Sequence, residues 1–136
     1  MNNVEPSRRY KKILLIDDDE VDCFISNRII KSSFIADEVI IKSSAAEGLG
    51  YLKSLSETHE ELPEIILLDL EMPVMDGFDF LEEFRMLGND IRTHCKIVAL
   101  TNGIKPSQVH KLKSMFSNQS IKLINKPLTV EALNIF

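Results

Sequence analysis

The 136-residue chain has no tryptophan, only two cysteines and no long apolar run. Cys23 and Cys95 lie far apart and form no Cys-x-x-Cys pair, which argues against a zinc site or a disulfide framework. No stretch approaches the roughly 18 consecutive apolar residues of a transmembrane helix. We therefore expect a cytoplasmic protein with reduced thiols and no membrane anchor.

Positive charge is also scarce, because 16 Lys and Arg stand against 21 Asp and Glu and the net charge is -5. No basic run is long enough to follow a phosphate backbone, so we expect no direct binding of nucleic acid. A hydrophobic content of 44% suits a single domain with its own core. Residues 1–9 show no periodicity and predict a mobile tail, followed by one domain over residues 10–136.

Short apolar runs alternate with helical patterns along this domain. The runs are too short for helices and predict buried strands at residues 13–16, 39–41, 65–68, 97–100 and 121–124. Apolar residues at spacings of three and four predict helices through residues 21–29, 49–55, 78–87 and 109–116, with a short last helix at 129–136. Residues 56–63 are acidic and polar, which indicates a solvated loop.

This alternation predicts an α/β fold with a doubly wound parallel sheet and helices on both faces, because parallel strands need long crossovers. Lys42 and Lys122 interrupt the second and fifth runs, and such charges are typical of exposed sheet edges. We therefore place these two strands outermost. The result is the flavodoxin-like strand order 2-1-3-4-5.

Polar residues directly follow four of the predicted strands, namely Asp17 and Asp18, Asp69, Thr101 and Lys126. Parallel strands end at one edge of the sheet, so these side chains should gather there. Carboxylates about 4 Å apart repel by roughly 4 kcal/mol per pair at an effective dielectric of 20, so we expect a cation between them. Oxygen ligands without Cys or His suit Mg²⁺. A lysine and a hydroxyl beside such an ion form a phosphoryl pocket, with Asp69 as the nucleophile.

These residues resemble the receiver domains of two-component response regulators, and the likeness covers about residues 12–136. The motifs that carry the resemblance are the acidic pair Asp17 and Asp18, Asp69 within Leu-Leu-Asp-Leu-Glu-Met-Pro-Val-Met-Asp-Gly, Thr101, and the Lys126-Pro127 pair. The resemblance implies that Asp18 and Asp69 bind Mg²⁺ directly, together with the backbone carbonyl of Glu71. Asp17 would act through a water molecule.

The resemblance further implies that Lys126 and Thr101 hold the phosphoryl oxygens and that the Lys126-Pro127 peptide is cis. The phosphoryl group would come from a phosphohistidine on a sensor histidine kinase or a histidine phosphotransfer protein. The domain would catalyse its own phosphorylation and dephosphorylation and would not be a turnover enzyme.

Two departures from the family pattern bear on signalling. Leu123 stands where the family often has an aromatic switch residue, three positions before Lys126. The last helix is short, and we expect no output domain after it. Such a receiver would signal by phosphorelay or by phosphorylation-dependent partner binding or self-association, through the fourth helix, the fifth strand and the last helix.

Two other classes of protein share parts of this pattern. Asp17, Asp19 and Val21 fit the Asp-x-Asp-x-Val motif of haloacid-dehalogenase-like phosphatases, but those enzymes need a further acidic pair after the lysine, where this chain has only Glu131. A nucleotide or flavin module of the same fold is the second alternative. The chain contains no Gly-x-Gly-x-x-Gly or P-loop to support it.

Overall fold

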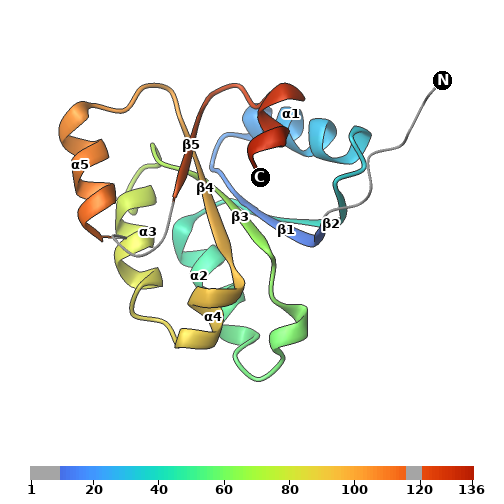
Figure 1. Ribbon diagram of the computed structural model, residues 1–136, viewed down its shortest axis with the longest axis vertical. Helices are drawn as coiled ribbons and strands as arrows, with labels where there is room; N and C mark the ends of the chain where they lie inside the picture. Colours follow the sequence, from blue (N-terminus) through green and yellow to red (C-terminus); the bar gives the residue numbers. More distant parts are fainter. Residues whose placement is uncertain (1–9, 116–120) are drawn as a thin grey trace.

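The computed structural model describes residues 10–115 and 121–136, so the tail expected at 1–9 lies outside the described residues. Five parallel strands form the central sheet in the order β2-β1-β3-β4-β5, which confirms the predicted fold and its edge strands (Figure 1). The strands are β1 (Tyr10–Ile16), β2 (Ala36–Lys42), β3 (Ile65–Asp69), β4 (Lys96–Thr101) and β5 (Lys122–Asn125).

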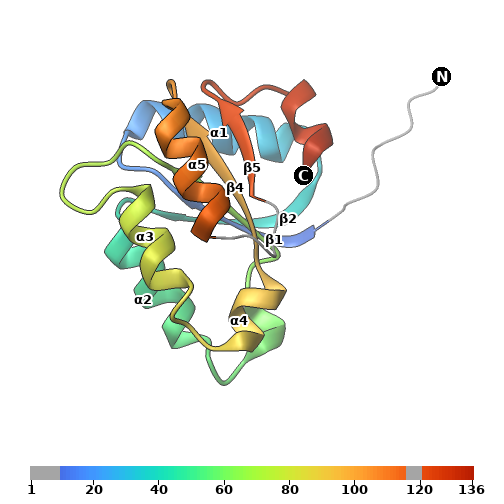
Figure 2. The same ribbon diagram turned by 60° about the vertical axis from the view of Figure 1, so that its left-hand side comes forward.

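Helices cover both faces of the sheet (Figures 1 and 2). The α-helices are α1 (Glu20–Ser32), α2 (Ala45–Ser54), α3 (Gly77–Phe84), α4 (Asn89–His94) and α5 (Pro106–Met115). Two 3-10 helices complete the described elements: η1 (His59–Glu61) and η2 (Glu131–Ile135). Among the described residues, none of these helices has the length and apolar character that crossing a membrane requires.

The strands separate two apolar cores, because successive side chains of a strand point to opposite faces. From β1, Leu14 and Ile16 belong to the core shared with α2 and α3. Ile13 and Leu15 belong to the core shared with α1 and η2. The sheet is therefore covered on both sides, as a parallel sheet requires.

Side chains cap the starts of two helices. The Ser44 hydroxyl accepts a hydrogen bond from the Glu47 amide (3.1 Å) and caps α2. Asp76 and Asp79 form a reciprocal capping box at the start of α3, where each side chain accepts from the other residue's backbone amide.

The apolar stripe predicted for α1, Val21, Phe24, Ile25 and Ile29, is wrong at its first two residues, whereas Ile29 does pack against the core. Val21 and Phe24 are 65% and 64% exposed, whereas Ser26 and Ile30 are buried. Asp22, Ser26 and Ile30 recur every four residues and therefore lie on one face of the helix. Because Asp22 pairs with Lys126 after β5, this face is turned toward the sheet and the more apolar residues are left outside.

The segment between α3 and β4 also differs from the prediction. α3 ends at Phe84, and α4 follows as an additional helix that the sequence analysis missed. Ile91 is the buried residue of α4, so a single apolar side chain anchors it and leaves only a weak helical pattern in the sequence.

Two further segments pack more closely than predicted. The expected solvated loop at residues 56–63 contains η1 and buries Leu62. The last helix is a 3-10 helix whose Leu133 and Phe136 are buried against the α1 side of the sheet. The predicted fourth helix is α5, and Phe116, expected at its end, lies outside the described residues.

Candidate functional site

The carboxyl ends of β1, β3, β4 and β5 lie at one edge of the sheet, where the predicted site residues meet (Figure 1). Asp17, Asp69 and Thr101 are each only 1% exposed. Lys126 follows β5, and its side chain is 8% exposed. The register of the parallel strands thus brings together polar residues from four distant parts of the chain.

Three carboxylates form a cluster at this edge, since one oxygen each from Asp17, Asp18 and Asp69 lies within 4.8 Å of the others. Asp17 and Asp69 are buried, whereas Asp18 is exposed. The buried Asp17 Oδ2 forms an ion pair with Lys126 at 3.2 Å but has no further hydrogen-bond partner among the described residues. The cluster therefore offers carboxylate oxygens with unused acceptor capacity, the kind of ligand that Mg²⁺ prefers.

Backbone amides orient two of these carboxylates. Asp17 Oδ1 accepts a hydrogen bond from the Asp19 amide, and Asp69 Oδ1 accepts one from the Glu71 amide, both at 3.0 Å. Burial raises the pKa of Asp69 from 3.8 to about 7, and the neighbouring charge of Asp17 adds to the rise. The amide of Glu71 and the charge of Lys126 oppose it. Burial, together with repulsion by Asp17, thus outweighs the stabilisation that Lys126 and the Glu71 amide give to the charged form of Asp69.

The amine of Lys126 forms ion pairs with three carboxylates. Its Nζ lies 2.8 Å from Asp22 Oδ2, 3.2 Å from Asp17 Oδ2 and 3.2 Å from Asp69 Oδ1. Burial alone lowers the pKa of Lys126, but the hydrogen bond to Asp22 and the charges of Asp17 and Asp69 outweigh it and raise the pKa. Lys126 is therefore a fixed positive charge beside Asp69.

Asp22 is the site residue that sequence analysis missed. It stands in the first turn of α1, three residues after the N-cap Asp19. Side chains of a helix tilt toward its N-terminus, so an acid at this position reaches back to the sheet edge. An additional acid in the first turn after the acidic run is the signal that could have identified it.

The hydroxyl of Thr101 is hydrogen bonded to Glu71. Thr101 Oγ1 donates to Glu71 Oε2 at 2.6 Å, and the amide of Asn102 donates to Glu71 Oε1 at 2.8 Å. The amide of Gly103 donates to Thr101 Oγ1 at 3.1 Å. The sequence predicted no contact of the Glu71 side chain with Thr101 or Asn102, so these hydrogen bonds are found only in the structure.

The segment after β3 folds back closely over its own start. A Cβ on Gly77 would lie 2.7 Å from Leu70 Cα and 2.8 Å from the carbonyl oxygen of Asp69, so a glycine is required there. Val74, in the same loop, has a positive φ of 67° and is fully exposed. The Lys126-Pro127 peptide is cis, as predicted.

Asp19, part of the phosphatase-like motif, and Leu123, at the position of the aromatic switch, each have a structural role. The Asp19 side chain accepts a hydrogen bond from the Asp22 amide at 3.0 Å and caps α1, which accounts for it without a catalytic role. Leu123, at the position of the usual aromatic switch, is half-buried and packs against the α2 and α3 core.

This fold and this arrangement of acids, threonine and lysine are those of a signalling receiver, and the family comparison agrees. Residues 13–134 match the model of the response regulator receiver domain, and the chain belongs to this family.

The individual relatives that follow share about a third or less of their residues with this chain in the aligned regions. Response regulator Rcp1 of Synechocystis sp. is 33% identical over 76 residues, which cover 55% of this chain and 52% of Rcp1. Sensor histidine kinase CheAY of Helicobacter pylori is 29% identical over 121 residues, which cover 89% of this chain and 14% of CheAY. The chain thus spans about half of the first relative and a small part of the second. A two-component response regulator from Cytophaga hutchinsonii has a similar crystal structure, with a TM-score of 0.82, 25% identity and 94% of each chain covered.

Proposed function

We propose that this protein is a phosphoacceptor that takes a phosphoryl group onto Asp69 and signals through the phosphorylated state. The observation that carries the proposal is the position of Asp69, whose Oδ1 lies 3.2 Å from Lys126 Nζ within a cluster of buried carboxylates. A carboxylate beside a fixed cation is the arrangement that aspartyl phosphate formation needs. The relatives named as a response regulator and a sensor histidine kinase support a role in phosphorelay signalling.

The carboxylates suit Mg²⁺, because they are hard oxygen ligands and one oxygen each from Asp17, Asp18 and Asp69 lies within 4.8 Å of the others. Asp18 and Asp69 would bind the ion directly, with the backbone carbonyl of Glu71, and Asp17 would act through a water molecule. When bound, Mg²⁺ would neutralise negative charge on the phosphoryl oxygens.

The side chains of this protein would then act in transfer from a phosphohistidine. A carboxylate oxygen of Asp69 attacks phosphorus, the new P–O bond forms as the P–N bond breaks, and the imidazole leaves with the electron pair and takes up a proton. Lys126 and Thr101 each hold a phosphoryl oxygen, by charge and by hydrogen bonding. Dephosphorylation reverses the modification when water attacks phosphorus and the Asp69 carboxylate leaves.

The donor would be a sensor histidine kinase or a histidine phosphotransfer protein, the partners of receiver domains. We place the protein in the cytoplasm, in keeping with its two free cysteines. The downstream partner, or a second copy of the chain, would bind the surface of α5, β5 and η2. Because Leu133 of η2 and Phe136 after it are buried, α5 and β5 would supply most of this surface.

The decisive experiment is incubation with Mg²⁺ and a small acyl phosphate, followed by intact-mass measurement and borohydride trapping of the modified residue. We expect one phosphoryl group on Asp69, lost when Mg²⁺ is chelated and absent from Asp69→Asn. Stoichiometric phosphorylation of Asp69→Asn at a residue outside the cluster would contradict the assignment.

A further inference from the structure

The carboxylate of Glu71 joins the loop after β3 to the loop after β4. One oxygen accepts from the Thr101 hydroxyl at 2.6 Å, and the other accepts from the Asn102 amide at 2.8 Å. Hydrogen bonds to an ionised carboxylate are among the stronger ones in proteins. The contact therefore fixes the first residues after β4 at the edge of the phosphoryl site.

The Thr101 hydroxyl carries a single proton, so it donates one hydrogen bond at a time. In this structure that proton goes to Glu71 Oε2, while the amide of Gly103 occupies an acceptor position on Thr101 Oγ1. Thr101 is thus unable to donate to a phosphoryl oxygen on Asp69 without leaving Glu71. The two acceptors, both anionic, compete for the same proton.

We propose that Glu71 is a positioning residue that holds Thr101 and Asn102 in the unphosphorylated arrangement and releases them when Asp69 is modified. The inference rests on the proposed function, because it concerns the same phosphoryl site. In the family pattern, the switch couples a threonine to an aromatic side chain, which this chain replaces with Leu123. Here the Glu71 side chain would control the position of the threonine.

Burial explains why the exchange is possible. Thr101 is 1% exposed, so its hydroxyl needs an acceptor in either state, and a phosphoryl oxygen is a good substitute. Glu71 is exposed, so water solvates its carboxylate after release. Each state therefore leaves no buried polar group unpaired at this position.

Release also frees the backbone of Asn102, the first residue after β4. The loop that begins there leads to α5 at Pro106. The change at Asp69 thus reaches α5 through the backbone, without a large side chain that swings. Leu123, an aliphatic residue packed in the core, is compatible with this route.

The test measures the affinity for beryllofluoride, a phosphoryl analogue, in saturating Mg²⁺ by calorimetry. We expect Glu71→Ala to bind it about threefold to tenfold more tightly, the loss of one competing hydrogen bond. Glu71→Gln, which keeps one acceptor oxygen, should lie between the wild type and Glu71→Ala.

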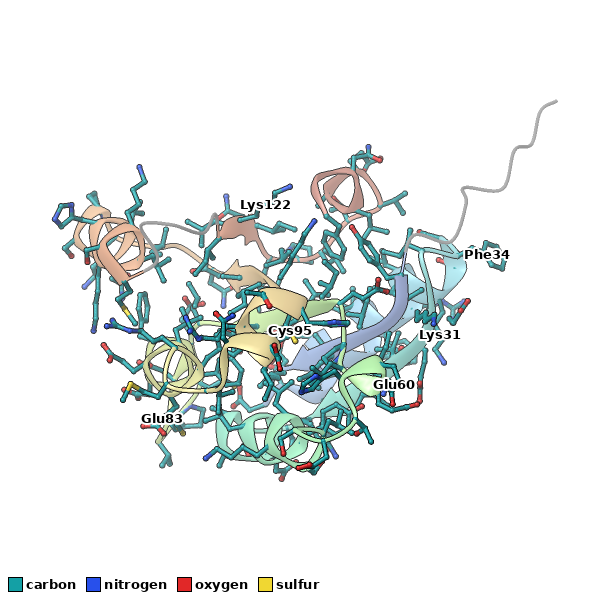
Figure 3. All side chains as sticks on the ribbon, turned by 60° about the horizontal axis from the view of Figure 1, so that its bottom comes forward. Lys31, Phe34, Glu60, Glu83, Cys95 and Lys122 are labelled. Carbon is teal, nitrogen blue, oxygen red and sulfur yellow. The ribbon has the colours of Figure 1, made fainter. Side chains whose placement is uncertain are left out.

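Removal of Glu71 also removes a negative charge near an anion site, and a Thr101→Val background separates the two effects. Without the hydroxyl there is no proton to compete for, so Glu71→Ala should then change the affinity less than twofold. Glu83→Ala is the matched control for net charge, because Glu83 is exposed on the outer side of α3 (Figure 3). It should leave the affinity unchanged.

An equal gain in both backgrounds would show simple charge repulsion and overturn the proposal, as would no gain in either. Failure of every variant to bind beryllofluoride would instead refute the proposed phosphoryl site. Hydrogen exchange of the Asn102 amide needs no ligand and tests the contact independently. Glu71→Ala should speed this exchange severalfold, and an unchanged rate would overturn the proposal.

Discussion

At the scale of single residues, Asp69 is held in an environment that disfavours its own charge. Burial and Asp17 raise the pKa of Asp69 to about 7, although Lys126 lies 3.2 Å away. A buried carboxylate next to a second one would be stabilised in its charged form by a cation bound between them. The same strain has a measurable cost in the metal-free protein.

We predict that Asp69→Asn stabilises the metal-free protein by roughly 1 to 3 kcal/mol at pH 8, since a pKa difference of one is worth about 1.4 kcal/mol. The folded protein holds a proton on Asp69 that the unfolded chain loses near its ordinary pKa of 3.8. Wild-type stability should therefore fall as the pH rises from about 4 to 7, and the advantage of Asp69→Asn should grow over the same range. Urea unfolding at several pH values would measure it, and a difference that does not vary with pH would contradict the prediction.

The positions of Asp17, Asp69, Thr101 and Lys126 were predictable because each is the last residue of a strand or the first after one, and parallel strands end at one edge. The contact between Glu71 and Thr101 was not, because it depends on the conformations of two loops that no local pattern specifies. The sequence thus predicted which side chains meet at this edge but not the hydrogen bonds between Glu71 and the residues at the end of β4.

At the scale of elements, the limits of sequence patterns are clearest in α1. Its apolar residues outnumber those that the sheet buries, and the rotation of the helix follows the ion pair of Asp22 with Lys126. A pattern of apolar spacing carries no information about such a distant partner. Phe34, after α1, likewise points outward with a positive φ of 56° (Figure 3).

The start of α1 provides a test of what Asp19 does. Asp19→Ala should lower stability by about 1 kcal/mol, the usual value of an N-cap, and leave phosphorylation of Asp69 intact. Urea unfolding and the phosphorylation assay would measure both effects, with Ser44→Ala at the cap of α2 as the matched comparison. Loss of all phosphorylation in Asp19→Ala would show a catalytic role instead.

The strand β5 provides a second test, in the residue that replaces the usual ring. Leu123→Ala should cost about 1 to 3 kcal/mol of stability, because a half-buried side chain leaves the core, but should preserve the response to beryllofluoride. Thr101→Ala should still accept a phosphoryl group and lose that response. The response is measured as the change in the amide NMR chemical shifts of α5 when beryllofluoride binds. A Leu123→Ala variant that folds normally yet responds as poorly as Thr101→Ala would make Leu123 the switch.

At the scale of the whole molecule, Mg²⁺ should act as a stabilising ligand. At a concentration of 100 times its dissociation constant, a ligand specific for the folded state adds about 2.7 kcal/mol of stability. Thermal unfolding should therefore shift upward with Mg²⁺ in the wild type and much less in Asp17→Asn or Asp69→Asn. An equal shift in all three proteins would place the ion elsewhere.

The hydrogen bond between Asp22 and Lys126 joins residues 104 positions apart in the chain. A chain that has formed β1 and β3 but not yet added β5 contains Asp17 and Asp69 without Lys126, the lysine that offsets their charge. Such a partly assembled molecule repels anions at its future site. Under the proposed function, the domain would become able to accept a phosphoryl group only once β5 has joined the sheet and placed Lys126 beside Asp69.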